Sequence, residues 1–202
     1  MDGTLIRNTD SVSFLCNLNH ADKTKLNGIL AKEDNNELHW IDADYEKVKL
    51  LEGLDVQIIS GALNELTVIH GLFELISEIH KMGWIAILVT AGPDVVARLI
   101  AEKYNFDHCY SSKYSIKNGK LTSEISYHVG EYGKVECLET FCQLYDVSKS
   151  NCIAIGDGAT DIQLFKNVGT SVAINYSESI KNYATFHINT RNILDISKFI
   201  FK

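Results

Sequence analysis

The sequence has no cluster of lysine or arginine residues, and its 202 residues carry a formal net charge of −7. Proteins that bind nucleic acids or anionic membranes do so largely by neutralising phosphate groups with basic side chains. We therefore expect neither nucleic acid nor a membrane among its partners. A phosphate-bearing substrate would have to be held by a few local cations.

Long apolar runs are also missing. No stretch reaches the roughly 20 residues that span a bilayer, and the first residues lack the basic start and apolar segment of a signal peptide. The sequence accordingly predicts a cytoplasmic protein. Its hydrophobic content of 46% is ordinary for a folded chain, and its length suffices for one core domain with a small insertion.

Cysteine patterns typical of disulfide frameworks or zinc sites are absent. The five cysteines are odd in number and include no C-x-x-C pair. The seven histidines are scattered without the spacing of metal ligands. We expect reduced thiols and individual structural histidines.

Two kinds of pattern divide the chain. From about residue 10 to residue 66 the apolar positions repeat with helical spacing among many charges. After residue 66, short apolar runs alternate with amphipathic helices, which is typical of a parallel sheet covered on both faces. The predicted helices are 72–82, 94–103, 134–145, 161–166 and 193–201, and the predicted strands are 84–90, 107–111, 151–155 and 171–174.

A hairpin signal interrupts this alternation. Asn118 and Gly119 lie between two short strands, 115–117 and 120–126, and suit a tight turn because both positions need positive φ. We therefore predict an α/β fold: a Rossmann-like parallel-sheet core with a β-hairpin flap and an inserted helical cap. Residues 1–9 and 67–202 would form the core domain, and residues 10–66 the cap domain.

Four short motifs follow one another along the predicted core. They read MDGTL at residues 1–5, VTAG at 89–92, lysine at 134 and IGDGATD at 155–161. Loops at the carboxyl ends of parallel strands line one crevice, so we expect the motifs to meet at one ligand. Each also has an ordinary structural interpretation, as a turn, a helix cap or a solvated lysine.

In this order the motifs resemble those of the haloacid dehalogenase superfamily: Asp-x-Asp-Gly-Thr, a Ser or Thr, a Lys, and an acidic Gly-Asp-Gly-x-x-Asp loop. The layout is most similar to phosphoserine phosphatases, which share the helical cap, the hairpin and the interval between the lysine and the acidic loop. The resemblance covers essentially the whole chain. It implies a magnesium-dependent phosphatase that hydrolyses a small-molecule phosphomonoester through an aspartyl-phosphate intermediate.

The resemblance also implies catalytic roles for three residues. Lys134 would supply a fixed positive charge to the phosphate, and the Thr90 hydroxyl would donate to a phosphate oxygen. Asp2 would protonate the leaving alkoxide and then activate water, which requires a carboxyl that exchanges its proton near neutral pH. The implied phosphate-binding residues are Gly3, Thr4, Thr90, Ala91, Gly92, Lys134 and Thr160.

Mg²⁺ is the implied cofactor. A phosphomonoester dianion that approaches carboxylates needs a divalent metal and fixed cations to offset the repulsion. Magnesium prefers oxygen donors, often one or two carboxylates with several waters. The candidate ligands are Asp157, Asp2 through its backbone carbonyl, and Asp161. Two alternatives for Asp161 stay open: it holds Lys134, or it is an ordinary acid in the first turn of a helix.

The residue that should attack phosphorus is missing from the sequence. In the family it is the Asp directly before the position of Met1, at the end of an apolar central strand, and the chain contains neither. Loss of a central strand would leave backbone groups unpaired and a gap in the core. We therefore hypothesise that the sequence starts late. The alternative is a protein that lacks the nucleophile.

The residues at the positions expected to recognise the substrate differ from those of phosphoserine phosphatases. There an acidic residue meets the substrate ammonium and a cap arginine meets its carboxylate; the matching residues here are Thr9, beside Asp10, and Lys47. Lysine offers a point charge in place of a bidentate fork, so recognition would be weaker or different. Thr160 also stands where that group usually has Asn. Phosphoserine is therefore one candidate substrate.

Two other functions stay open. One is a regulatory module that binds phosphate and Mg²⁺ without turnover, and the other is an enzyme of this family that uses a different reaction or acceptor. One fold hosts many functions, so the fold does not choose among them. The sequence does not predict the oligomeric state.

Overall fold

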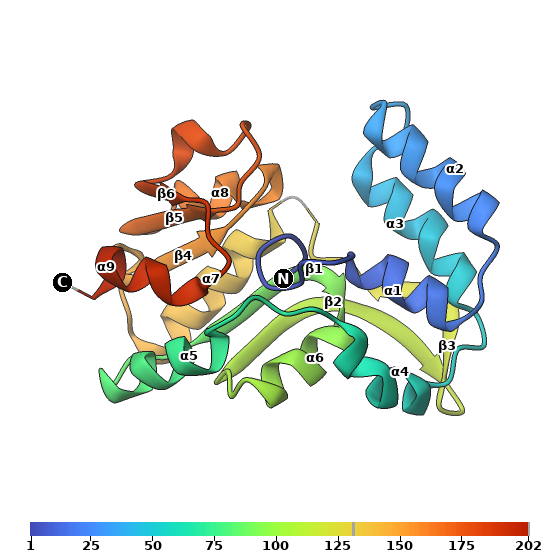
Figure 1. The fold of residues 1–202 in the computed structure, drawn as a ribbon, viewed down its shortest axis with the longest axis horizontal. Coiled ribbons are helices and arrows are strands. Elements are labelled where there is room, and N and C mark those ends of the chain that lie inside the picture. The colour runs from blue at the N-terminus through green and yellow to red at the C-terminus, as the bar shows by residue number, and fades with distance from the viewer. Residues whose placement is uncertain (131, 202) are drawn as a thin grey trace.

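The computed structural model describes residues 1–130 and 132–201 (Figure 1). The helices are α1 (Ser11–Leu18), α2 (Lys23–Asp34), α3 (Trp40–Val48), α4 (Val56–Ala62), α5 (Leu72–Lys81), α6 (Asp94–Lys103), α7 (Gly133–Tyr145), α8 (Ile162–Phe165) and α9 (Ser197–Ile200). The strands are β1 (Ile87–Pro93), β2 (His108–Lys117), β3 (Lys120–Tyr127), β4 (Ile153–Gly156), β5 (Thr170–Ile174) and β6 (Phe186–Ile188).

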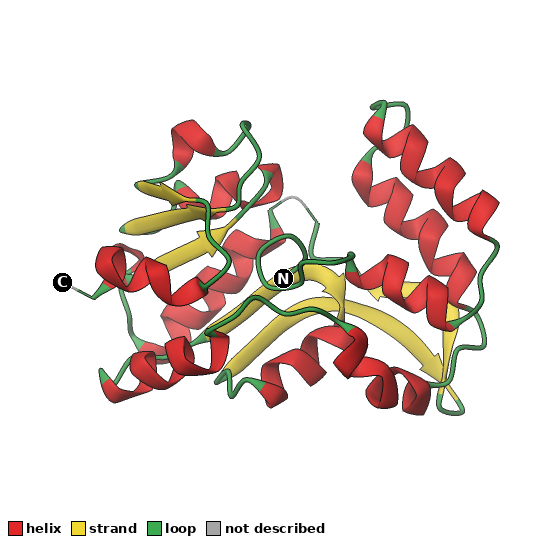
Figure 2. Cartoon of the chain, in the orientation of Figure 1, coloured by secondary structure: helices red, strands yellow, loops and turns green. Residues whose placement is uncertain are grey.

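The strands form two three-stranded sheets, where the sequence pattern predicted one (Figure 2). In the first sheet β1 pairs in parallel with β2, and β2 pairs antiparallel with β3. In the second, β4, β5 and β6 are all parallel. Within the described residues no strand joins β1 to β4, so each has one unpaired edge. The α/β class and the parallel pairing are confirmed.

One long strand, β2, replaces two predicted short ones. Its first part pairs with β1 and its last part with β3 across the turn at Asn118 and Gly119, whose φ angles are 52° and 77°. Ser111, where the first predicted strand ended, and Ser112 are buried within β2. The Ser112 hydroxyl accepts the backbone N–H of Val129 at 3.0 Å. The hairpin is therefore confirmed, as the end of a strand that also belongs to the sheet.

The segment before residue 66 holds four α-helices, as its periodicity predicted. Three of them begin at aspartates whose carboxylates accept an N–H from the first turn: Asp10, Asp22 and Asp55. The hairpin is joined to this segment because the N–H of Leu121 donates to the carbonyl of Leu54 at 2.8 Å. The helical segment thus lies against β3, at the opposite end of the molecule from β4, β5 and β6 (Figure 1).

The chain end departs slightly from expectation. The predicted helix 193–201 begins as a 3-10 turn, Ile193–Ile196, and continues as α9. The strand β6 was not predicted because three residues carry too little periodicity to be recognised. No helix in the described ranges combines the length and apolarity needed to cross a membrane.

An apolar cavity of ≈ 690 Å³ lies between the two sheets. Leu88 on β1 and Ala154 on β4 line it on the two unpaired edges, and Leu75 and Leu138 line it from the covering helices α5 and α7. Protein interiors normally leave few voids larger than a water molecule. A cavity of this size, bounded by two unpaired strand edges, could accommodate one more β-strand.

Candidate active site

The first motif and the acidic loop are in direct contact. The Thr4 hydroxyl donates a hydrogen bond to Oδ1 of Asp157. Gly3 has φ +74°, and a Cβ at this position would lie 2.1 Å from Asp157 Oδ2, so this close approach requires glycine. Burial raises the pKa of the Asp157 carboxyl, while the Thr4 hydrogen bond acts in the opposite direction. The result is a partly buried carboxylate beside the backbone of residues 2–4.

Lys134 and the acidic loop form a buried ion pair. Lys134 belongs to the first turn of α7. Its Nζ atom lies 2.6 Å from Asp161 Oδ1 and 3.0 Å from the Thr160 hydroxyl oxygen. The other Asp161 oxygen accepts the backbone N–H groups of Asp157 and Gly158. Burial by itself raises the pKa of Asp161, but the Lys134 ammonium outweighs it and the pKa lies below its ordinary value. These contacts favour the alternative in which Asp161 holds Lys134.

Asp2 is bound to the start of α1. Its two carboxylate oxygens accept the backbone N–H and the hydroxyl of Ser11, each at 2.8 Å. Burial raises the pKa of Asp2, and the Ser11 hydrogen bonds work against that rise. A carboxyl with a raised pKa is suited to taking and giving a proton near neutral pH.

The second motif packs on the first. Thr90, near the carboxyl end of β1, is buried, and its hydroxyl oxygen accepts the N–H of Gly92 at 3.0 Å. A Cβ on Gly92 would lie 3.0 Å from Asp2 Oδ2, so the carboxyl end of β1 packs tightly against the first motif. The four motifs that the sequence predicted to converge therefore form one continuous set of contacts.

Thr9 and Lys47 have other partners in the structure. Lys47, on α3, is buried, and its Nζ atom lies 3.0 Å from carboxylate oxygens of both Glu33 and Asp44. Burial lowers the pKa of Lys47, but these two carboxylates more than compensate and the pKa is raised. The Thr9 hydroxyl donates to the carbonyl of Asp10. These partners of Lys47 and Thr9 all lie outside the four motifs.

Sequence reasoning missed two residues that position the site. Ser11 fixes both oxygens of Asp2. The N–H of Ser177, after β5, donates to the Asp157 carbonyl at 2.8 Å. The Asp-Ser pair at the start of a helical pattern is a capping signal that points to Ser11. No comparable signal marks Ser177, because its contribution is a backbone N–H from the loop after β5.

The fold and the site define an α/β protein in which an acidic loop, a buried lysine and a buried threonine of β1 come together. Residues 1–166 match the haloacid dehalogenase-like hydrolase family. The phosphoserine phosphatase of Methanocaldococcus jannaschii is 30% identical over 156 residues, covering 77% of this chain and 74% of that protein. The phosphoserine phosphatase of Lactococcus lactis is 29% identical over 179 residues, covering 88% and 83%.

Solved structures agree. A substrate-bound phosphoserine phosphatase complex matches with a TM-score of 0.86 at 26% identity, over 99% of this chain and 95% of that chain. A HAD family hydrolase from Salmonella enterica serovar Typhi matches in fold with a TM-score of 0.91 at 20% identity, over 99% and 68%. The chain belongs to the haloacid dehalogenase-like hydrolase family. The predicted family, its phosphoserine phosphatase-like layout, the fold class and the hydrolase class are confirmed.

Proposed function

We propose that the protein is a phosphatase that hydrolyses a small-molecule phosphomonoester through an aspartyl-phosphate intermediate. The observation that carries this proposal is the run of contacts from Lys134 through Asp161 and Asp157 to Thr4. It gathers a fixed cation, a carboxylate and a hydroxyl in one place, as a phosphate dianion requires. Similarity to a solved phospho-aspartyl intermediate analogue of phosphoserine phosphatase, at 26% identity, supports the intermediate.

In this mechanism Lys134 binds and neutralises the phosphate. Its ammonium is held by Asp161, so the charge is already positioned before substrate arrives. The Thr90 hydroxyl oxygen accepts the Gly92 N–H, which leaves its own proton available for a phosphate oxygen. The remaining phosphate donors are the backbone N–H groups around Gly3 and Ala91.

Asp2 moves the proton. We assign it the role of general acid towards the leaving alkoxide and then of general base towards water. The two Ser11 hydrogen bonds fix the orientation of its carboxyl group. The carboxyl proton would be carried on Oδ2, the oxygen that faces Gly92.

Mg²⁺ is the proposed cofactor, and the donor chemistry fits it. In the described part of the chain no three His, Cys, Asp or Glu side chains gather as ligands. Magnesium is often held by only one or two carboxylates together with waters and phosphate oxygens. Asp157 and the backbone carbonyl of Asp2 would supply the protein oxygens. Asp161, which accepts the backbone N–H of Asp157, would support the position of that ligand. A bound ion would offset the negative charge that develops on the phosphoryl oxygens.

The nucleophile is proposed from the cavity between the sheets. Its two long walls are the unpaired edges of β1 and β4, and Met1 lines its end beside Gly92. We assign the slot to an apolar β-strand whose last residue is an aspartate directly before Met1. Such a strand would satisfy backbone groups on both edges and would deliver its carboxylate next to Asp2.

We also propose that residues 10–66 act as a cap over a core formed by residues 1–9 and 67–202. One contact supports a closed arrangement. His128, shortly before Lys134 in the chain, has its Nε2 atom 3.0 Å from Oδ2 of Asp44 on α3. A cap held over the site would exclude water while the leaving group departs.

The proposed reaction is tested with a chain that carries the strand and aspartate before Met1. We expect its hydrolysis of p-nitrophenyl phosphate to need Mg²⁺, to stop with EDTA, and to fall by at least about 100-fold in Asp157→Asn. Asp195→Asn, on an exposed acid away from the site, is the matched control and should retain full activity. Metal-independent turnover, or full activity of Asp157→Asn, would overturn the magnesium proposal.

Phosphoserine should not be a strongly preferred substrate. The Lys47 ammonium is already paired with two carboxylates, and Thr9 provides no negative charge for a substrate ammonium. We expect kcat/KM for phosphoserine to stay within about tenfold of that for glycerol phosphate, a difference of about 1.4 kcal/mol. Steady-state assays with both substrates check this. A preference for phosphoserine of 100-fold or more, on the order of 2.7 kcal/mol, would contradict it.

A second candidate function is a module that binds phosphate and Mg²⁺ without turnover. It is favoured by one observation: Asp2, Asp157 and Asp161 all have hydrogen-bond partners, and none stands apart as a nucleophile. This candidate predicts stabilisation by phosphate and Mg²⁺ but no hydrolysis, even in the extended chain. A cytoplasmic location and a small-molecule partner also stay predictions.

A further inference from the structure

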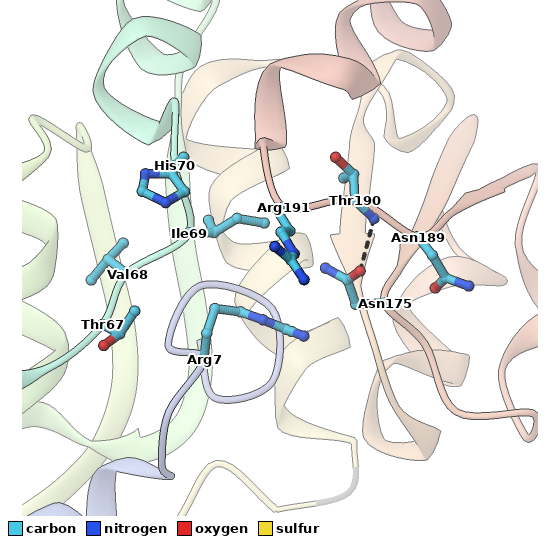
Figure 3. A pocket seen from close by; sticks show the side chains of 9 residues that line it. All are labelled: Arg7, Thr67, Val68, Ile69, His70, Asn175, Asn189, Thr190 and Arg191. Atoms are coloured by element: carbon cyan, nitrogen blue, oxygen red, sulfur yellow. Dashed lines mark hydrogen bonds between the residues drawn. The ribbon is translucent and has the colours of Figure 1, made fainter.

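A second pocket, of ≈ 690 Å³, lies beside the first motif, and most of the residues that line it have polar side chains (Figure 3). Four segments meet there: Arg7 after the first motif, residues 67–70 before α5, Asn175 after β5, and residues 189–191 after β6. None of the phosphate-binding residues assigned above lines it. The lining residues are Arg7, Thr67, Val68, Ile69, His70, Asn175, Asn189, Thr190 and Arg191.

The pocket concentrates positive charge in an acidic protein. The sequence contains three arginines, Arg7, Arg98 and Arg191, and two of them line this pocket. Figure 3 shows their guanidinium groups reaching into the same space from opposite sides. In the described residues neither forms an ion pair with a carboxylate, and no acidic residue lines the pocket. Two converging guanidinium groups without a counter-ion repel each other unless an anion joins them.

A neutral donor points to the same place. The Asn175 amide oxygen accepts the N–H of Thr190 at 2.9 Å, which fixes the orientation of the amide group. Its Nδ2 atom is buried and has no hydrogen-bond partner. Figure 3 shows this nitrogen beside the Arg191 side chain. A buried donor without a partner costs free energy, which a ligand acceptor would recover.

The donors are held by an ordered backbone. The N–H of Arg7 donates to the carbonyl of Thr67 at 2.8 Å, and the N–H of Ile193 donates to the carbonyl of His70 at 2.9 Å. One guanidinium nitrogen of Arg7 donates to the Gly3 carbonyl, which leaves most of its five N–H groups available. Since these segments are already fixed, little ordering would be needed to bind an anion.

We propose that this pocket is a second oxyanion-binding site, for a small metabolite that carries a phosphate-type dianion. Guanidinium groups bind such oxygens through paired N–H donors, and a doubly charged group matches two arginines. The volume leaves room for the rest of a small ligand. Because Arg7 also binds Gly3, the occupant would lie next to the loop that contacts Asp157 without using the catalytic residues.

The test uses ¹⁵N-labelled protein and inorganic phosphate at constant ionic strength, in EDTA. We expect phosphate to shift the NMR signals of the Asn175 side-chain amide and the Arg191 backbone amide. Arg191→Gln and Arg7→Gln should each weaken this binding by about tenfold, and Arg98→Gln by less than twofold. Arg98 is the matched control because it carries the same charge outside the pocket, paired with Asp94 at 3.2 Å.

Three results would overturn the proposal. The first is that the signals of Asn175 and Arg191 do not shift while the amides of residues 90–92 respond. The second is that Arg98→Gln weakens phosphate binding equally, which would indicate general charge attraction, and the third is that succinate binds more tightly than phosphate, which would contradict a phosphate-type ligand. The readout is binding at named amides. It therefore stays informative whether or not the protein hydrolyses phosphomonoesters.

Discussion

A chain extended by an apolar β-strand that ends in aspartate before Met1 will hydrolyse p-nitrophenyl phosphate at least about 10³-fold faster than the 202-residue chain. The proposed reason is that the residues now in place would bind phosphate and move a proton, whereas the carboxylates among them are already held by other groups. Asp2 is held by Ser11, and Asp161 is held by Lys134. Initial rates of both purified chains in Mg²⁺ measure the difference.

The same extension should also stabilise the fold. The added strand would fill the ≈ 690 Å³ apolar cavity and pair with β1 and β4. Thermal unfolding should therefore occur at a higher temperature in the extended chain. A strand that ends in asparagine is the matched control, because it should give the stability without the activity. Equal rates for the aspartate and asparagine chains would rule out this nucleophile.

Replacing Lys134 by methionine should lower both activity and stability. The rate falls by about 10²–10³-fold because a fixed charge on the phosphate is lost. The free energy of unfolding falls by about 3–5 kcal/mol because Asp161, 10% exposed, is left as a buried charge without its partner. Turnover in the extended chain and denaturant unfolding measure the two effects separately.

A second substitution separates the two roles of this lysine. In Lys134→Met/Asp161→Leu neither member of the ion pair is left without its partner, so much of the stability should return while activity stays low. Lys149→Met provides the control, since Lys149 pairs with Glu139 on the surface and its loss should cost no more than about 1 kcal/mol. Recovery of activity in the double variant would show that Lys134 acts only through the fold.

Local chemistry explains which elements could be predicted. Aspartate caps, the Asn118-Gly119 turn and regular apolar spacing each act within a few residues, so the helices and the hairpin followed from the sequence. The break expected after Ser111 was wrong because β2 continues through Ser112, whose buried hydroxyl accepts the backbone N–H of Val129, a residue distant in sequence. The three-residue strand β6 has too short a pattern to be recognised.

The sequence by itself determined the four motifs, their order and hence the family, because each motif is a short run whose residue types and spacing are read directly. Tertiary structure decided the partners: Ser11 for Asp2, Asp161 for Lys134, two carboxylates for Lys47, and the meeting of Arg7 with Arg191. Those pairings join segments separated along the chain, and only the packing of the sheets and loops sets their distances. A residue type therefore shows which chemistry is available, and the fold decides where that chemistry is used.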